Sequence, residues 1–287
     1  MELIREKNGN LRILQLTDLH IGQLPFDNDD IRTFDHIKKV SNEYNPDLIV
    51  ITGDLIWSEG IEKPGKSFEE LIKVLNSLQK PITVTYGNHD TEENITRSDL
   101  RELEKKLDYK VNKKHSYIVE ERESYCIELR DESQELLNVL YVIDSGAVDP
   151  LRIGTYEYVH PKQVNWFYDV SNFYKQEKSK KTEDLLFLHI PLPEYKDAWK
   201  NGQVYGYKYE EVSSPVLNTG LFTSLLLDKQ VKGVFCGHDH DNDFDAIYHG
   251  IKLCFGRVSG FNCYGELSRG ARIIELQSNE SFKTYLI

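Results

Sequence analysis

Cysteine is scarce in this chain of 287 residues, and so are long apolar runs. The four cysteines, Cys126, Cys236, Cys254 and Cys263, lie far apart and form no CxxC pair. Disulfide frameworks belong to small secreted chains, so four reduced thiols are expected, with Cys236 and Cys254 buried on strands. No run approaches the roughly 18 apolar residues of a membrane span, and no apolar signal-like segment follows Met1. We therefore expect a cytoplasmic protein with no membrane partner.

Positive charge is also in deficit, with 35 Lys and Arg against 47 Asp and Glu, a net charge of −12. Phosphate contacts need clustered Lys and Arg, so an extended nucleic-acid surface is not expected. An acidic enzyme can still act on anions where bound metal ions reverse the local sign of the charge. The hydrophobic content of 39% and charged content of 29% are ordinary for a globular protein and argue against disorder.

The first hundred residues predict a strand-helix-strand-helix-strand unit. Strands are expected at 11–17, 47–52 and 82–86, and helices at 31–44 and 68–78, closed by Pro46 and Pro81. The run at 47–52 is rich in branched apolar residues, which is typical of a strand buried on both faces. Ligands of open α/β sheets bind outside the carboxyl ends of the strands, so polar residues that follow these strands are expected to converge.

The rest of the chain continues the mixed pattern. Further strands are expected at 137–143, 185–188 and 231–236, and helices at 97–107, 164–170 and 217–227. We interpret 113–129 as a charged surface hairpin, 175–184 as a solvated helix end and linker, and 194–214 as a long loop near the site. The tail predicts four short strands, at 244–248, 251–255, 272–276 and 282–286, forming an antiparallel second sheet. No repeat or clear linker is present, which favours one two-layer domain over residues 1–287.

Histidines and carboxylates gather at the predicted strand ends. His238 and His240 follow a strand and Gly237, and in extended backbone their rings would leave the same side about 6.6 Å apart. That spacing suits two metal ions about 3.5–4 Å apart better than one. The strand-end donors are Asp18, His20, Asp54, Asn88, His89, His189, His238 and His240. Imidazole with carboxylate suits Mn, Fe, Zn, Co or Ni, and the lack of thiolates disfavours a structural zinc site. The remaining histidines, His36, His115, His160 and His249, are interpreted as non-catalytic.

These motifs resemble those of the calcineurin-like metallophosphoesterases in order and spacing over about residues 11–260. The matching motifs are Asp18-x-His20, Gly53-Asp54, Gly87-Asn88-His89-Asp90, His189 and Gly237-His238-x-His240. The likeness implies an α/β fold in which two sheets are sandwiched between helices, with a dinuclear metal centre. A narrower likeness is to the purple-acid-phosphatase-like, or phosphoprotein phosphatase, branch. It rests on the segment His189–Tyr195, the segment Gly237–Phe244, Tyr264-Gly265 and Arg269-x-x-Arg272.

The resemblance also implies a ligand for each position. One metal would take Asp18, His20, Asp54 and His240; the other would take Asp54, Asn88, His189 and His238. Asp54 would then bridge the two ions, since one carboxylate can span two cations. A bridging water would become hydroxide for in-line attack on phosphorus. His89 is our candidate for protonating the leaving oxygen, and Asp90 either orients His89 or caps the following helix.

Two departures from relatives narrow the resemblance. Trp57 stands three residues after Asp54, where purple acid phosphatases have a tyrosinate ligand, so the purple chromophore is not expected. Leu55-Ile56-Trp57-Ser58 replaces the Asp and Arg that calcineurin-type protein phosphatases carry there. Arg97 and Arg257 are the candidates to replace that phosphate-binding arginine.

The function expected from these residues is metal-dependent hydrolysis of a small-molecule or protein phosphoester. A phosphomonoesterase is the first interpretation, and a phosphodiesterase acting on cyclic nucleotides or small diesters is the alternative. Tyr264 and the 194–214 loop are expected to shape the pocket, and Trp57 or Tyr205 to pack or to stack a base. A nuclease fits the motifs but not the net charge. A non-catalytic binding scaffold would tolerate lost ligands, and none is lost here.

Overall fold

The computed structural model describes residues 1–6, 9–180, 182–278 and 281–287. Within these residues the chain forms two β-sheets and six α-helices. The helices are α1 Asn28–Tyr44, α2 Pro64–Ser77, α3 Arg97–Glu104, α4 Pro161–Glu177, α5 Glu194–Asn201 and α6 Leu221–Asp228. Among these residues, no helix is both long and apolar enough to cross a membrane.

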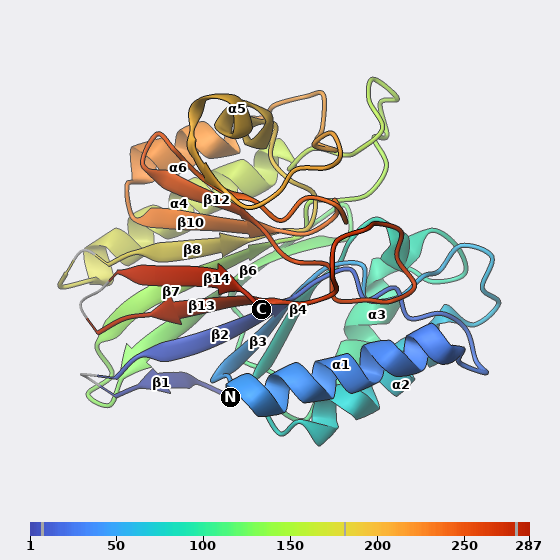
Figure 1. Ribbon diagram of the computed structural model, residues 1–287. Coiled ribbons are helices and arrows are strands. Elements are labelled where there is room, and N and C mark those ends of the chain that lie inside the picture. The colour runs from blue at the N-terminus through green and yellow to red at the C-terminus, as the bar shows by residue number, and fades with distance from the viewer. Residues whose placement is uncertain (7–8, 181, 279–280) are drawn as a thin grey trace.

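A five-stranded sheet is built around the first half of the chain. Its strands are β2 Leu11–Leu16, β3 Leu48–Thr52, β4 Ile82–Thr85, β13 Arg272–Leu276 and β14 Phe282–Leu286, in the order β14-β13-β2-β3-β4. Strands β2, β3 and β4 run parallel, as the strand-helix repeat predicts, while β13 pairs antiparallel with β2. Helices α1, α2 and α3 cover its outer face, in the lower half of Figure 1.

A nine-stranded sheet contains most strands of the second half of the chain. Its strands are β1 Leu3–Arg5, β5 Lys114–Val119, β6 Arg122–Asp131, β7 Leu136–Ile143, β8 Asp184–Phe187, β9 Gln203–Tyr205, β10 Val231–Cys236, β11 Asp245–Tyr248 and β12 Ile251–Phe255. The path is β1-β6-β7-β8-β10-β12-β11-β9, with β5 paired to β6. Helices α4 and α6 cover its outer face (Figure 1). The predicted sandwich, two sheets between helices in one domain, is confirmed.

Alternating side chains explain the buried strands. Ile49 and Ile51 of β3 pack beneath α1 and α2, whereas Leu48 and Val50 of the same strand point into the core between the two sheets. Both faces of β3 are therefore out of water, which is why its sequence is apolar without alternation. Helix α1 begins at an Asp27 capping box and ends at Asn45 in the left-handed conformation, just before Pro46.

The tail strands were predicted to form the second sheet by themselves, and this is wrong. β11 and β12 extend the nine-stranded sheet, where β12 runs parallel to β10. β13 and β14 complete the five-stranded sheet beside β2. Short strands carry no local signal for the edge that they will join, because that choice depends on contacts far along the chain.

The charged segment 113–129 forms the predicted hairpin, in which β5 pairs antiparallel with β6, but the prediction that it lies on the surface is wrong for β6. Its second strand, β6, is largely buried and pairs with β1, β5 and β7. The arginines of β6 pair both locally and at long range: Arg122 with Glu120 and Glu157, each at 2.9 Å, and Arg130 with Glu128 at 2.9 Å and Glu177 at 2.6 Å. Buried charges are tolerated when they are paired, so the polar sequence concealed an interior strand.

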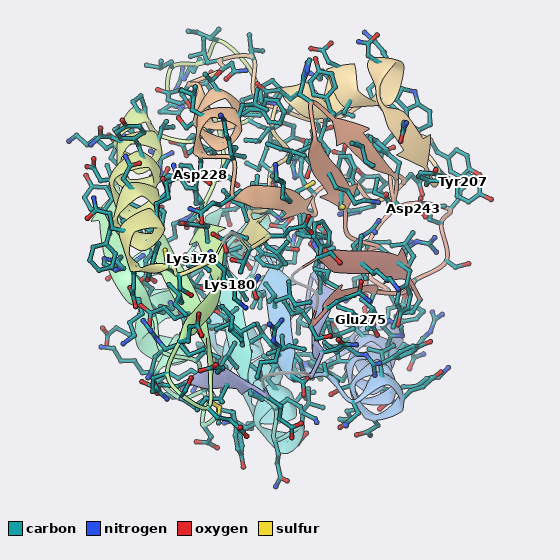
Figure 2. The ribbon with its side chains drawn as sticks, turned by 90° about the vertical axis from the view of Figure 1, so that its left-hand side faces the viewer. Lys178, Lys180, Tyr207, Asp228, Asp243 and Glu275 are labelled. Atoms are coloured by element: carbon teal, nitrogen blue, oxygen red, sulfur yellow. The ribbon has the colours of Figure 1, made fainter. Side chains whose placement is uncertain are left out.

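Two other segments also differ from the prediction. Residues 194–214 contain helix α5 and strand β9 in place of a continuous loop. In the predicted solvated linker, the Lys178 side chain is 2% exposed and lies 2.5 Å from the buried Asp184 carboxylate. Figure 2 shows Lys178 on the side of the molecule that carries α4 and α6. Lys181, in the same predicted linker, lies outside the described residues.

Candidate metal centre

The candidate site lies where the carboxyl ends of strands from both sheets meet. The side chains follow β2 (Asp18, His20), β3 (Asp54), β4 (Asn88, His89), β8 (His189) and β10 (His238, His240). The backbone N–H of Asp18 donates to Gly53 O at 3.1 Å, and that of His20 donates to Asp54 O at 3.0 Å. These bonds join the turns after β2 and β3, and the predicted convergence of the strand-end donors is present.

Several of these residues have left-handed backbone conformations. The φ angles are 54° at Asp18, 46° at His20, 50° at Asp54 and 80° at His238. Such angles are uncommon for residues with a side chain and are found where the surroundings enforce them, often at functional sites. The backbone at His238 is therefore not extended, and the 6.6 Å spacing expected for an extended pair does not apply.

Gly237 is required for close approach to the turn after β2. A Cβ at this position would lie 1.9 Å from Thr17 Oγ1 and 2.7 Å from Asp18 Oδ2. Without a side chain there, the His238 N–H reaches the Asp18 carboxylate at 3.1–3.2 Å. Gly237 thus brings the turns after β2 and β10 together, while the tight turn itself falls on His238.

One group of donors surrounds Asp18. His20 Nε2 lies 3.5 Å from Asp54 Oδ2 and 4.0 Å from Asp18 Oδ1. His240 Nε2 lies 3.5 Å from Asp18 Oδ1. Ligand atoms of Asp18, His20 and Asp54 all lie within 4.8 Å of one another. This grouping agrees with the first ligand set implied by the motifs.

A second group shares Asp54. Its ligand atoms and those of His189 and His238 lie within 4.8 Å of one another, with His189 Nε2 3.1 Å from Asp54 Oδ2. The Asn88 side-chain oxygen lies 3.2 Å from His189 Nε2, and His189 Nδ1 lies 2.8 Å from Thr52 O. Asp54 is the residue common to both groups, as a bridging ligand has to be.

Among the residues that the structure describes, several buried polar atoms at the centre have no hydrogen-bond partner. They are both ring nitrogens of His20, Asp54 Oδ2, His238 Nε2 and His240 Nδ1. All four side chains are at most 7% exposed. Burying polar atoms without partners costs free energy, so their convergence indicates a missing common partner. Nitrogen and oxygen donors in this arrangement fit transition-metal cations, and the residues present fit a pair of such ions.

The electrostatics of the protein alone support cation binding. Burial raises the pKa of Asp18, but the hydrogen bond and charge of the nearby imidazoles outweigh burial and lower it to about 2. The imidazoles likewise hold the pKa of Asp54 well below its ordinary value, against the effect of burial. Burial lowers the pKa of His20 and of His238 to about 3. The carboxylates are thus ionised and His20 and His238 neutral, the forms that bind metals. His189 differs: burial disfavours its charge, but the Asp54 carboxylate outweighs burial and raises the pKa of His189 to about 10, so this imidazole would release a proton on binding a metal.

His89 lies at the rim of the centre. Its imidazole centroid is 5.1 Å from that of His20, and its side chain is 26% exposed. Glu92 Oε1 lies 2.8 Å from His89 Nδ1, and the Trp57 indole stacks on the ring. The indole therefore packs within the site, the role expected for Trp57.

Asp90 is placed differently from either role considered for it. Its fully buried carboxylate accepts hydrogen bonds from the backbone N–H groups of Ile56 at 3.0 Å and Gly87 at 2.7 Å. It therefore fixes the turn after β4, and Glu92 is the carboxylate that contacts the His89 ring. Burial and the nearby charge of Asp54 raise the pKa of Asp90 to about 7.

Both arginines proposed to bind phosphate are engaged elsewhere. Arg97 is buried, pairs with Asp144 at 2.7 Å and donates to Gly87 O at 3.1 Å. Arg257 pairs with Asp243 and donates to Ser268 O. Figure 2 shows Asp243 beside Tyr207, whose N–H donates to the Asp243 carboxylate at 2.7 Å. Neither arginine is therefore a free phosphate ligand in this structure.

Aromatic and acidic side chains border the centre. The Tyr264 ring lies 4.2 Å from that of His240, and its hydroxyl donates to Glu210 at 2.8 Å. Tyr264 and the segment 194–214 therefore meet beside His240, one of the candidate ligands. Tyr156 makes an edge contact with His238 at 4.2 Å between ring centroids. Tyr205 is 65% exposed.

Sequence reasoning missed two residues of the site, Glu92 and Cys263. Glu92 stands three residues after His89 in a short turn that begins as a 3-10 helix over His89–Thr91, a spacing that could have suggested contact. Cys263 lies within 4.8 Å of donor atoms of His20 and His240, and no local motif indicates this. Within the described residues, His36, His115, His160 and His249 do not belong to any of the grouped donor sets. The four cysteines are free thiols, as expected.

The sequence matches the profile of the calcineurin-like phosphoesterase family over residues 11–242. A relative from Arabidopsis thaliana, named probable inactive purple acid phosphatase 14, is 29% identical over 94% of this chain and 76% of its own length. Phosphatase DCR2 of Saccharomyces cerevisiae is also 29% identical, over 95% of this chain and 52% of its own length.

Solved structures share the fold at low sequence identity. A dimetal phosphatase from Danio rerio superposes with a TM-score of 0.61 at 10% identity, covering 96% of this chain and 98% of its own. GAP50, described as the anchor in the inner membrane complex of Plasmodium, superposes with a TM-score of 0.59 at 15% identity, covering 97% and 84%. At these identities the likeness concerns the fold alone.

Proposed function

The chain belongs to the calcineurin-like phosphoesterase family. We propose that it is a phosphomonoesterase that depends on two metal ions. The observation that carries the proposal is the set of buried, unpartnered nitrogen and oxygen atoms that converge around Asp54. A protein that had lost its metals would have no reason to retain these atoms, because each is costly to bury alone.

We assign the ligands as two sets joined by Asp54. Asp18, His20 and His240 would hold one ion with it, and Asn88, His189 and His238 the other. When bound, two such ions activate water as a nucleophile near neutral pH and neutralise charge on the phosphoryl oxygens. Mn, Fe, Zn, Co and Ni all remain compatible with these donors.

His89 is the proposed proton donor to the leaving oxygen. Contact with Glu92 occupies Nδ1, which leaves Nε2 as the ring nitrogen that can face the substrate. The Glu92 carboxylate restrains the rotation of the ring, so that Nε2 stays directed at the leaving oxygen. On transfer of the Nε2 proton, the leaving group departs as a neutral alcohol or phenol and His89 becomes neutral.

Asp90 is proposed to support the reaction indirectly. Its hydrogen bonds to the N–H groups of Ile56 and Gly87 hold the turns that follow β3 and β4. Those turns carry Asp54 and His89, and the His89 N–H donates to Asp54 at 2.9 Å. Loss of Asp90 would therefore displace a metal ligand together with the proton donor.

A non-catalytic scaffold is the second candidate function, and two observations favour it. Three Arabidopsis relatives are named probable inactive purple acid phosphatases, and a similar fold serves as the anchor called GAP50. The retained donor set argues for catalysis in this chain. The relative named Phosphatase DCR2 supports the choice of monoesters over diesters.

The decisive experiment compares wild type, Asp54→Asn, His89→Ala and His249→Asn after reconstitution with Mn²⁺ or Fe²⁺. Cleavage of an aryl phosphate monoester and an aryl phosphate diester is measured beside metal content. We expect Asp54→Asn to lose bound metal, and His89→Ala to keep two ions while turnover falls by about 10²–10⁴-fold. His249 is exposed and outside the site, so its variant serves as the control.

Each alternative has its own outcome in this experiment. Wild-type protein that holds two ions per chain and cleaves neither ester would be a scaffold. Faster cleavage of the diester would identify a phosphodiesterase. Equal loss of metal in Asp54→Asn and His89→Ala would remove His89 from its proposed role.

A further inference from the structure

Cys263 is held against the metal centre by the long segment between β12 and β13. Its thiol donates to the backbone carbonyl of Asp18 at 3.0 Å, and the neighbouring Asn262 side chain donates to His20 O at 3.2 Å. Gly260 N–H also donates to Asp18 O at 3.0 Å. The segment therefore lies directly on the turn that presents Asp18 and His20.

This close contact depends on a glycine. A Cβ at Gly260 would lie 2.4 Å from the carbonyl oxygens of both Asp18 and Leu19. Because any larger residue would push the segment away from the turn, the sequence places Cys263 at a fixed distance from the centre. Cys263 is also the least buried of the four cysteines; Cys126, Cys236 and Cys254 lie in the apolar cores.

The sulfur has unsatisfied metal ligands as neighbours. Sγ of Cys263 and one ring nitrogen each of His20 and His240 lie within 4.8 Å of one another. His20 is 2% exposed with both ring nitrogens unpartnered, and His240 is 5% exposed with Nδ1 unpartnered. The thiol thus faces buried donors that themselves need a cation, which separates it from an isolated surface cysteine.

We propose that Cys263 is an additional ligand of the metal ion held by His20 and His240. The proposal rests on the dinuclear centre proposed above and concerns only one half of it. On coordination the S–H bond breaks, a sulfur–metal bond forms, and the proton passes to solvent; no oxidant or reductant takes part. The other half, with His189 and His238, keeps nitrogen and oxygen donors only.

A thiolate makes the two halves chemically different. Soft sulfur favours Zn²⁺, Co²⁺ and Fe²⁺ over Mg²⁺ and Mn²⁺, which prefer oxygen. The half that contains Cys263 is therefore expected to retain zinc or cobalt most tightly. The negative charge of the thiolate also lowers the net charge of the metal-bound centre by one. The ion held by His189 and His238 is therefore expected to be the more electrophilic of the two.

The test uses Co²⁺ as the probe on the full chain, with wild type, Cys263→Ser and Cys126→Ala. Thiolate bound to Co²⁺ gives a near-ultraviolet charge-transfer band, which oxygen and nitrogen ligands do not give. We expect the band to grow until one Co²⁺ per chain carries sulfur, to vanish in Cys263→Ser and to persist in Cys126→Ala. Zn²⁺ is expected to bind Cys263→Ser about tenfold or more weakly, the scale seen when support for a metal site is removed.

A second measurement needs no variant. Bound Co²⁺ or Zn²⁺ should protect one thiol of the native wild-type chain from a disulfide reagent, and chelation should restore its reactivity. Peptide mapping should identify that thiol as Cys263.

The outcomes separate this proposal from the proposed function. Two bound Co²⁺ ions without a charge-transfer band, and with Cys263 still reactive, would overturn the proposal and leave the phosphoesterase intact. Failure of wild type to bind Co²⁺ or Zn²⁺ would overturn both. A band that survives in Cys263→Ser would assign the sulfur to another cysteine and would also overturn it.

Discussion

The indole of Trp57 stacks on the imidazole of His89, with ring centroids 4.3 Å apart and an interplanar angle of 19°. Glu92 holds the same ring through Nδ1 at 2.8 Å. A flat apolar surface and one carboxylate thus fix both the plane of the imidazole and its rotation. Trp57 stands where purple acid phosphatases have a metal-binding tyrosinate, and in this chain the side chain at that position packs against His89, the proposed proton donor.

Trp57→Ala should lower kcat while leaving metal content unchanged. The imidazole would lose the surface that fixes its plane, and small misplacements of a catalytic group cost up to about a hundredfold in rate. Trp57→Phe, which keeps an aromatic face, should recover most of the rate. Steady-state kinetics with an aryl monoester and elemental analysis measure both effects. Loss of metal in Trp57→Ala would show that the indole supports the ligands.

Glu92→Gln should reduce kcat by roughly tenfold or more and leave KM nearly unchanged. Glutamine keeps the size of the side chain but replaces a charged hydrogen-bond partner of Nδ1 with a weaker neutral one, so the ring is held less firmly. Glu93→Gln is the matched control, because the Glu93 carboxylate accepts from the Gly60 N–H, whereas the His89 ring is contacted by Glu92. A comparable loss of rate in both variants would indicate a general electrostatic effect and contradict the specific pairing.

Arg97→Ala should destabilise the protein by about 3–5 kcal/mol, because it leaves the Asp144 carboxylate buried without its partner. Arg32→Ala is the control: Arg32 pairs with Asp29 at 2.6 Å, but both side chains are exposed, so a change of at most about 1 kcal/mol is expected. Urea unfolding followed by circular dichroism measures both. Similar midpoints for Arg97→Ala and wild type would contradict a structural role for Arg97.

Gly237→Ala should abolish metal binding and strongly destabilise the fold. The added methyl would meet Thr17 Oγ1 at 1.9 Å, far inside contact distance, and would force the turns after β2 and β10 apart. Gly65→Ala in α2 meets only side-chain atoms, at 3.3 Å or more, and should stabilise its helix by up to about 1 kcal/mol. Normal metal content in Gly237→Ala would contradict the conclusion that close packing of these two turns is needed for metal binding.

Removal of metal by a chelator should lower the thermal midpoint of wild type. A ligand that binds only the folded state stabilises it by about 2.7 kcal/mol at 100 times its Kd. In Asp54→Asn the carboxylate proposed to bind both ions is replaced by an amide, so the thermal midpoint of this variant should change little on addition of the same chelator. Differential scanning calorimetry with and without chelator measures the shift. Identical midpoints for wild type in both conditions would indicate that the donor set does not bind metal when folded.

The parts of the fold that sequence predicts well have local signals. In the sequence, each of the strands β2, β3 and β4 is an apolar run followed by a polar turn. Their parallel arrangement and the convergence of the donors after them therefore follow from periodicity and topology. Strand β6 could not be recognised as buried because Arg122 and Arg130 find their partners at Glu157 and Glu177. No local rule reveals that two distant charges will neutralise each other.

In the site, too, some residues can be recognised from local sequence and others depend on contacts far along the chain. Its histidines and carboxylates are recognised by type and by their place after strands. The proposed role of Cys263 depends on its contact with Asp18, which lies 245 residues earlier in the chain. That contact is possible because Gly260 lets the loop pack closely on the turn after β2. Asp90 was recognised as part of a motif, but only its contacts with Ile56 and Gly87 show what it holds.

The pairing of β2 with β13 has a consequence for how the protein matures in the cell. Arg12 on β2 contacts Glu275 on β13 across 263 residues of chain, so one edge of the strand that leads to Asp18 stays open during most of synthesis. Once β13 and β14 have left the ribosome, that edge is covered. This half of the proposed centre therefore depends on a strand pairing that can form only after every proposed ligand, from Asp18 to His240, has been synthesised.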